Sequence, residues 1–492
     1  MQFNSYLFIM LFLPSCLAGY FGLQHMGKKE GARLFLAAMS LLFFAYGNPW
    51  YLMLLLASTG FNWRISRLLL GRSRGTGRKA DGESVNSSRD GGRRKAILIL
   101  GIGANLGLLF YYKYSNFFLE NLNLFLKQDL LLTRILLPVG ISFFTFQQVA
   151  WLADSYRGET GGYGFLDYAI FTVYFPKIAM GPILLHREFI PQLKEEARQR
   201  MDPGNMSKGL MVFAAGLFKK VILAEFFAGP VAWGFSQVGS LSSSDAFLVM
   251  LAYTFQLYFD FSGYCDMAVG ISRMFNLELP QNFNSPYKAL SPVDFWKRWH
   301  MTLTRFLRNY IYFPLGGSRK GTVRTYVNVM LVFLASGLWH GANWTFILWG
   351  LIHGAAQCLN RMYDRQWNRL HTAFQWLATF LFVNLSWVIF RADSISQAKQ
   401  FFKRLVGFEN MQINPGFVDS FKMVELPQVF LDHRLMTIFL IYGIALHLVM
   451  NTRNMAEAGL KPTALRGAGT ALLLVWSVIS LAGISTFIYF QF

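Results

Sequence analysis

The sequence predicts an all-α membrane protein that crosses the bilayer many times. Three observations predict this class: a high hydrophobic content, long apolar runs, and basic residues gathered between the runs. Of the 492 residues, 54% are hydrophobic and only 15% are charged, whereas soluble domains carry about 25% charged residues. The runs are continuous rather than alternating, so they predict transmembrane helices of about 20 residues and not the strands of a barrel.

Basic loops predict the path of the N-terminal half, because cytoplasmic loops are enriched in Lys and Arg. Residues 6–20 form a first span with an extracytoplasmic N-terminus, since basic residues follow this run and none precedes it. Residues 71–95 hold eight basic and three acidic residues among many Gly and Ser, which predicts a flexible cytoplasmic linker. Residues 165–185 must begin and end inside, so we expect a re-entrant segment bent at Pro176 and Pro182.

The same rule divides the C-terminal half. Residues 277–324 contain eight basic and two acidic residues and are predicted to be a cytoplasmic segment on the catalytic face. Two apolar runs flank a predicted helix break at residues 340–343. Further on, the basic stretch 399–404 predicts an amphipathic helix at the membrane interface. The last run, 467–492, leads outward, so the C-terminus is also expected outside. The count is roughly ten or eleven transmembrane or re-entrant segments in one integral membrane domain, residues 1–492.

Net charge and cysteine usage exclude two other classes. The formal charge of +20 lies in loops beside a lipid bilayer, and no soluble basic domain exists to carry phosphate contacts, so we expect no nucleic-acid partner. The three cysteines, Cys16, Cys265 and Cys358, lie in apolar surroundings without metal-like spacing. We therefore expect no disulfide framework and no metal site.

His340 is the strongest candidate catalytic residue. It follows Leu338 and Trp339 between two apolar runs, and an ionisable residue inside a membrane segment is costly unless it has a function. Imidazole titrates near neutrality, and burial favours its neutral, proton-accepting form. The structural alternative, a histidine that only hydrogen-bonds a neighbouring helix, stays open.

A second histidine, His300, is expected on a cytoplasmic helix. Ser291 followed by Pro292 is a good helix start, with Ser as the N-cap and Pro at the first helical position. Helical spacing places His300 on one face with Trp296. The basic residues of this segment are Arg298, Arg305, Arg308 and Lys320. They predict either a lipid-headgroup anchor or a site for the phosphates of a nucleotide-bearing donor.

Tyr489 closes the last apolar run. At about 1.5 Å per residue it lies roughly 33 Å from Gly467, near the outer edge of a hydrocarbon core about 30 Å thick. Physical chemistry alone favours an interfacial aromatic anchor at this position.

Several motifs together carry a family resemblance. They are Leu257-Tyr258-Phe259-Asp260-Phe261-Ser262-Gly263-Tyr264, Asn282-Phe283-Asn284-Ser285-Pro286-Tyr287, Phe295-Trp296-Lys297-Arg298-Trp299-His300, Gly337-Leu338-Trp339-His340-Gly341-Ala342-Asn343 and the C-terminal Phe487-Ile488-Tyr489-Phe490-Gln491-Phe492. With them the sequence resembles the membrane-bound O-acyltransferase superfamily, and within it the bacterial alginate and peptidoglycan O-acetyltransferase group. Two positions depart from the pattern. Cys265 stands where Ser is common, and Asn309 stands where Asp is common, which puts in doubt a role for an acid there.

The resemblance implies a fold and roles for particular residues. The fold would be a ring of helices around a central tunnel that joins a cytoplasmic donor to an outer acceptor. His340 matches the family's essential buried histidine and His300 its second motif histidine, while Tyr489 matches a tyrosine thought to carry the acyl group. Trp339 and Asn343, in the motif of His340, are expected at the donor site.

The resemblance also implies the partners. Acetyl-CoA is the expected donor, with no permanently bound cofactor. An extracytoplasmic partner of the SGNH type, with a serine nucleophile, would pass acetyl to a polysaccharide, and the location would be the bacterial inner membrane. Which polymer is acetylated stays open. So do two alternatives: transfer of D-alanyl or another acyl group from a carrier protein, and a proton-coupled transporter, which the absence of an internal repeat disfavours.

Overall fold

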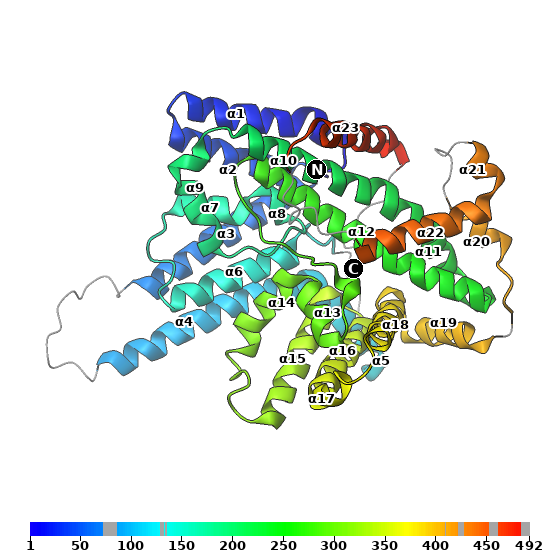
Figure 1. Ribbon diagram of the computed structural model, residues 1–492. Coiled ribbons are helices and arrows are strands. Elements are labelled where there is room, and N and C mark those ends of the chain that lie inside the picture. The colour runs from blue at the N-terminus through cyan, green and yellow to red at the C-terminus, as the bar shows by residue number, and fades with distance from the viewer. Residues whose placement is uncertain are drawn as a thin grey trace. The chain divides into compact units, whose positions relative to one another are not determined.

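A computed structural model describes residues 1–71, 86–127, 132, 135–408, 410–421, 428–451 and 461–483. Every regular element in these ranges is a helix (Figure 1), which confirms the all-α prediction. The chain divides into two compact units. The first comprises residues 1–207 with 271–280, and the second comprises residues 208–270 with 281–492.

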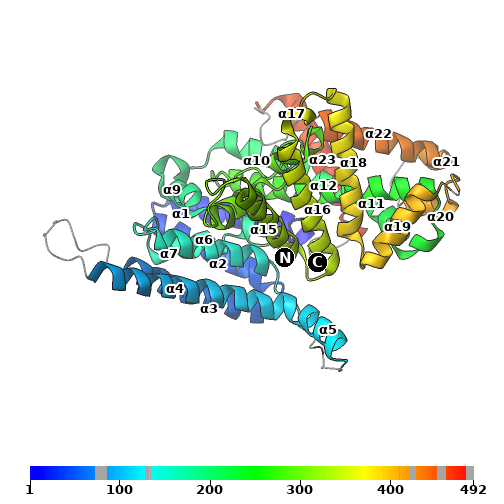
Figure 2. The ribbon, with the colours of Figure 1, turned by 90° about the horizontal axis from the view of Figure 1, so that it is seen from below.

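The first unit contains the helices of the N-terminal part of the chain. They are α1 (Leu13–His25), α2 (Lys29–Ala45), α3 (Pro49–Leu70), α4 (Asn86–Leu109), α5 (Ser115–Leu126), α6 (Ile141–Tyr156), α7 (Phe165–Val173), α8 (Phe175–Ile178) and α9 (His186–Lys194). Figure 2 shows α3 beside α4, and α4 running on through the π-helical turn η2 (Phe110–Tyr114) into α5. The predicted bend in residues 165–185 is present, because α7 ends before Pro176 and the chain is non-helical around Pro182.

One helix of this unit begins later than the sequence suggested. The apolar run 135–156 predicts a single membrane helix by its composition, but α6 begins at Ile141. Pro138 removes a backbone donor, and Gly140 has a φ of +74° in the left-handed region, which a continuing right-handed helix does not accommodate. The turn brings Gly140 against the backbone of Ile178, where a Cβ would lie 2.3 Å from the carbonyl oxygen.

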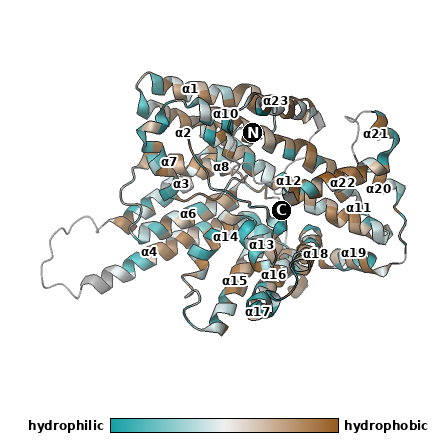
Figure 3. Cartoon of the chain, viewed as in Figure 1, coloured by the Kyte–Doolittle hydropathy of each residue, from teal (hydrophilic) through white to brown (hydrophobic). Residues whose placement is uncertain are grey.

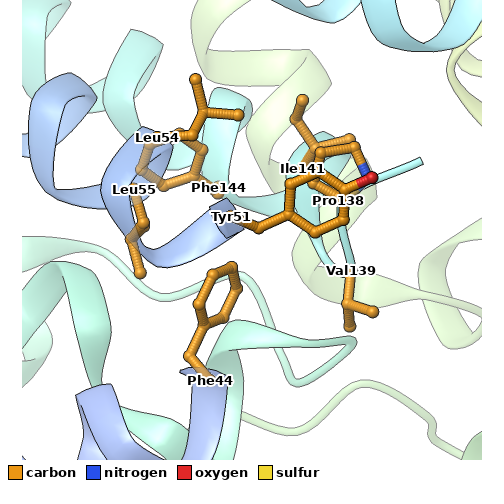
Figure 4. Close-up of a pocket in the computed structure, with 8 residues that line it drawn as sticks. All are labelled: Phe44, Tyr51, Leu54, Leu55, Pro138, Val139, Ile141 and Phe144. Carbon is orange, nitrogen blue, oxygen red and sulfur yellow. The ribbon is translucent and has the colours of Figure 1, made fainter. Parts of the chain in front are cut away.

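A small apolar hollow lies in the first unit, between α2, α3 and the chain that leads into α6 (Figure 4). Its lining is Phe44, Tyr51, Leu54, Leu55, Pro138, Val139, Ile141 and Phe144. The one hydroxyl among them, that of Tyr51, donates a hydrogen bond to the Leu136 carbonyl at 2.6 Å. A site with no acid, base or nucleophile has no chemistry of its own, so this hollow is not a candidate active site.

The second unit contains the remaining helices around an aromatic core. They are α10 (Pro203–Phe218), α11 (Glu225–Ser236), α12 (Ser243–Met274), α13 (Pro292–Arg298), α14 (Met301–Leu307), α15 (Thr322–His340), α16 (Trp344–Met362), α17 (Asp364–Trp367), α18 (Thr372–Arg391), α19 (Ile395–Gly407), α20 (Pro415–Asp419), α21 (Gln428–Asp432), α22 (Arg434–Asn451) and α23 (Ala464–Ile479). α10 and α12 each cross the boundary between the units. α19 covers the stretch for which an amphipathic helix was predicted.

Four helices among the described residues are long and apolar enough to cross a membrane. They comprise Leu7–His25, Gly91–Leu126, Thr322–His340 and Thr372–Arg391, and two shorter apolar helices are Arg434–Met450 and Ala464–Ile479. Figure 3 shows hydrophobic residues along α22, whereas α17 is mainly hydrophilic. The chain is thus a multi-pass membrane protein. The total of ten or eleven transmembrane or re-entrant segments stays a prediction, because turns, lysines or π-helical residues interrupt several of the expected spans.

Close contact between α15 and α16 depends on two facing glycines. A Cβ added at Gly337 would lie 2.3 Å from the Phe346 carbonyl oxygen, and one at Gly350 would lie 2.5 Å from that of Phe333. Real Cβ atoms essentially never approach this closely, and here the obstacle is backbone, which cannot rotate away. Gly337 is three residues before His340, so this contact sets where the end of α15 lies.

Gly337→Ala is therefore expected to force the two helices apart and to lower the free energy of unfolding by about 1–3 kcal/mol, the usual cost of overpacking. The measurement is thermal unfolding in detergent. Gly103→Ala is the matched control, because no atom lies within 4 Å of a Cβ added there on α4. Equal melting temperatures for the two variants would contradict the packing argument.

Candidate active site

His340 is the last residue of α15, at the predicted break. Gly341 is extended, with φ −163°, and Asn343 begins α16 as its N-cap by accepting a hydrogen bond from the Thr345 backbone at 3.1 Å. The Asn343 side chain also donates to the Asp393 carbonyl at 2.9 Å. The break at residues 340–343 is confirmed, and it places an imidazole at the end of a membrane helix.

Aromatic rings surround His340, whose exposed fraction is 4%. The ring centroids of Trp339, Trp349 and Phe390 lie 4.9, 5.2 and 5.2 Å from that of His340, all in edge-on geometry. Such rings exclude water and supply no charge that would hold the imidazole in its protonated form. The imidazole of His340 therefore lies in an aromatic environment with little access to water.

His300 does not lie on a continuous helix, contrary to the sequence prediction. α13 begins as predicted, with the Ser291 hydroxyl accepting from the Asp294 backbone at 3.0 Å, but it ends at Arg298. Trp299 is extended, and His300 has a φ of +44° and begins α14 as its N-cap. The left-handed conformation is costly for a non-glycine residue and persists where surrounding contacts require it, commonly at functional sites.

Asn282 supplies those contacts. Its side-chain oxygen lies 3.1 Å from His300 Nδ1 and accepts hydrogen bonds from the Thr302 backbone and hydroxyl at 3.2 and 2.9 Å. Its backbone carbonyl accepts from the Met301 N–H at 2.9 Å. One asparagine thus binds three successive residues at the start of α14 and turns the chain at His300.

The structure brings His300 and His340 together within the second unit. Their ring centroids are 6.5 Å apart, and Trp339 packs against both, at 5.8 Å from His300 and 4.9 Å from His340. His300 is fully buried and lies between α13 and α14, outside the spanning helices. Burial lowers its pKa to about 3, so His300 is neutral at pH 7. The two imidazoles lie close enough together to act on one substrate.

Comparison with known proteins supplies the class of substrate chemistry. A family model described as MBOAT, membrane-bound O-acyltransferase family, matches residues 99–396, more than half of the chain. The chain belongs to the membrane-bound O-acyltransferase family. This O-acyltransferase is 42% identical to the peptidoglycan O-acetyltransferase of Helicobacter pylori over 441 residues, which cover 84% of this chain and 81% of the relative.

Other relatives extend the comparison. A probable alginate O-acetylase of Pseudomonas aeruginosa is 36% identical over 423 residues, which cover 84% of this chain and 76% of that protein. The teichoic acid D-alanyltransferase of Bacillus subtilis is 27% identical over 247 residues, covering 49% and 62% of the two chains. The O-acyltransferase therefore has relatives whose names give two different acyl groups.

The predicted phosphate-binding residues of the O-acyltransferase differ in their surroundings. Arg298 pairs with Asp294 at 2.9 Å and is partly buried, as is Arg305. Arg308 and Lys320 are exposed, and Lys320 follows two glycines with positive φ. The exposed pair is the part of this set most accessible to a soluble donor. Tyr489 lies outside the described residues, as does most of the predicted linker 71–95.

α12 supports the histidine pair through residues to which sequence reasoning gave no role. Phe261 packs edge-on against His300 with centroids 4.8 Å apart, and Cys265 Sγ accepts a hydrogen bond from the Asn282 amide at 3.3 Å. Asp260, next to Phe261, pairs with Lys220 on the π-helical turn η4 (Lys219–Ala224), and both side chains are buried. Two features of the sequence could have pointed to these contacts: Asn282 stands in one of the family motifs, and Asp260 is an acid within an apolar run.

His353 has the structural role that a buried histidine more often has. Its Nδ1 accepts from Trp296 Nε1 at 3.1 Å, and its Nε2 lies 3.0 Å from the Ser386 hydroxyl. That hydroxyl donates to the Val383 carbonyl at 2.7 Å, so His353 Nε2–H is the donor to Ser386. Both ring nitrogens are bonded within the core, and His353 is not a candidate acid or base.

One group among the described residues has the composition of a metal site: Asp154, Glu159 and His186 in the first unit. Arg157 lies 3.1 Å from Asp154, and Arg187 lies 3.6 Å from Glu159. Two guanidinium groups already neutralise the two carboxylates, which opposes binding of a divalent cation. This group is better explained as an ion-pair cluster, and no catalytic role is assigned to it.

Proposed function

We propose that this O-acyltransferase moves acetyl groups from cytoplasmic acetyl-CoA across the bacterial inner membrane for O-acetylation of an extracytoplasmic polysaccharide. The observation that carries the proposal is the buried pair of His300 and His340 in a chain of this family. The names of the relatives with identities of 36% and 42% support acetyl as the acyl group and a polysaccharide or peptidoglycan as the acceptor. Both termini of the chain are extracytoplasmic in this proposal.

The base in the proposed reaction is His340. A hydroxyl attacks the thioester carbonyl while neutral His340 takes the hydroxyl proton, and the C–O bond forms. The tetrahedral intermediate then collapses, the C–S bond breaks, and the imidazolium returns the proton to the CoA thiolate. The aromatic surroundings support this role, because they exclude water that would otherwise compete for the imidazole nitrogen. His300 positions the donor or stabilises the developing oxyanion.

The donor binds at the basic residues of the segment 277–324. Exposed Arg308 and Lys320 are the strongest candidates for contact with its phosphates. Arg298 and Arg305 stand earlier in the same segment and are partly buried. Trp339, which packs on both histidines, is then placed to line the acyl path. Asn343, whose side chain caps α16, contributes through the position of the helix rather than through direct contact.

The acyl carrier in the proposal is the Tyr489 hydroxyl, which passes acetyl to an outer partner with a serine nucleophile of the SGNH type. Membrane vesicles that receive acetyl-CoA labelled in the acetyl group on the cytoplasmic side test both steps. The expected results are labelled esters on outer polysaccharide and a labelled C-terminal peptide in mass spectrometry. Tyr489→Phe keeps the ring of an interfacial anchor but not the hydroxyl, so unchanged labelling in that variant contradicts the carrier role.

A second candidate function is D-alanyl transfer from a carrier protein. The similarity to a teichoic acid D-alanyltransferase over about half of the chain favours it. An acidic carrier would also be attracted to the basic segment 277–324. Labelled D-alanine in place of labelled acetate on the C-terminal peptide, with co-purification of a small acidic protein, would support this function instead.

A further inference from the structure

The orientation of the Asn282 amide is determined by its neighbours. The Thr302 backbone N–H, which can only donate, points at the atom assigned as the side-chain oxygen, at 3.2 Å. On the other side the amide nitrogen donates to Cys265 Sγ at 3.3 Å. Exchanging oxygen and nitrogen would set two donors against each other at Thr302, so the assignment holds.

This orientation has a consequence for His300. The amide oxygen of Asn282 can only accept a hydrogen bond, and His300 Nδ1 lies 3.1 Å from it. Nδ1 must therefore carry the proton. Because burial keeps the ring neutral at pH 7, the second nitrogen, Nε2, then has no proton and holds a lone pair. The edge-on Phe261 and the left-handed backbone at residue 300 keep the ring in this place.

We propose that Asn282 is a positioning residue that holds His300 in the Nδ1–H tautomer, so that Nε2 accepts a hydrogen bond from an O–H or N–H group of the substrate. The inference rests on the proposed function in one respect, that His300 contacts substrate. It decides between the two roles given above for His300: a ring without a proton on Nε2 cannot donate to an oxyanion from that nitrogen. The group that Nε2 recognises is a donor, such as an amide N–H of the acyl-CoA arm or the attacking hydroxyl.

The tautomer is measured directly by nitrogen NMR of the full chain in lipid nanodiscs, with ¹⁵N in the imidazoles. Protonated and unprotonated ring nitrogens have well separated shifts, and His300→Gln assigns one signal among the eight histidines. The expected result is Nδ1–H in the wild-type protein and a mixture of tautomers in Asn282→Ala. Nε2–H in the wild-type protein would overturn the proposal. This readout does not depend on acyl transfer, so it stands even if the proposed donor or acceptor is wrong.

A pH–rate profile tests the effect on the reaction. Asn282→Asp keeps an acceptor for Nδ1–H and Thr302 but places a carboxylate against the ring, which favours the imidazolium. The rate of acyl transfer should then fall on the acid side at a higher pH than in the wild type. Asn282→Ala should lose about ten- to hundredfold in rate, the range typical of groups that orient a functional histidine.

Thr302→Val is the matched control, because it removes one hydrogen bond to the Asn282 oxygen and leaves the contact to His300. Its tautomer and pH–rate profile should match the wild type. If Asn282→Ala does not fold, Asn282→Asp still tests the proposal, because its carboxylate oxygen can accept the same hydrogen bonds from His300 and Thr302. An Asn282→Asp profile identical to the wild-type profile would mean that Asn282 has only a structural role.

Discussion

His340→Ala is expected to lower acyl transfer by about 10²- to 10⁴-fold, the range that a positioned general base contributes. The reason is chemical: Trp339, Trp349 and Phe390, which pack against His340, cannot take the hydroxyl proton. The neighbouring imidazole of His300 contacts substrate in the proposed reaction but does not replace His340 as the base. The measurement is transfer of labelled acetyl in membrane vesicles, normalised to the amount of folded protein.

His340→Gln separates the base from the structural alternative. Glutamine keeps a polar group of similar size at the end of α15 but does not accept a proton near neutral pH, so it should be as inactive as the alanine variant. Recovery of activity in His340→Gln would mean that the residue only hydrogen-bonds a neighbour. His447→Ala, an exposed histidine on α22, is the control and should keep wild-type activity.

Sequence patterns predicted the features of this site that depend on local chemistry. The break after His340 follows from Gly341 and the helix-capping Asn343, and the start of α13 follows from Ser291 and Pro292. Helix caps and helix starts depend on residues that are neighbours in the sequence, so they can be predicted without knowledge of the fold. His340 itself was found because an ionisable group in an apolar run has few explanations.

The features that were missed depend on partners distant in the sequence. Regular spacing suggested one helix through His300, whereas the actual turn is imposed by Asn282, 18 residues earlier. The pair of Lys220 and Asp260 spans 40 residues, so no residue near Lys220 in the sequence indicates its carboxylate partner. Tertiary contacts override local pattern at both places. The predicted central tunnel depends on the placement of whole units and stays a prediction.

Asp260→Ala is expected to lower the free energy of unfolding by about 3–5 kcal/mol, because it leaves the Lys220 ammonium buried without its carboxylate. The two side chains are only 2% and 3% exposed, so water cannot replace the lost partner. Asp266→Ala, in the neighbouring pair with Lys219, is the comparison. That pair is 18% and 13% exposed, and its loss should cost less. Chemical unfolding in detergent micelles measures both.

The double variant Lys220→Met with Asp260→Leu distinguishes stability from catalysis. Replacing both charged side chains with apolar ones removes the unpaired ion, so the double variant should regain most of the stability that Asp260→Ala loses. Asp260 adjoins Phe261, which packs on His300, so a pair that serves as a scaffold should regain acyl transfer together with stability. If the double variant is stable but inactive, the charges of Lys220 and Asp260 contribute to the reaction itself. If it is no more stable than Asp260→Ala, the cost arises from packing along α12 rather than from an uncompensated charge.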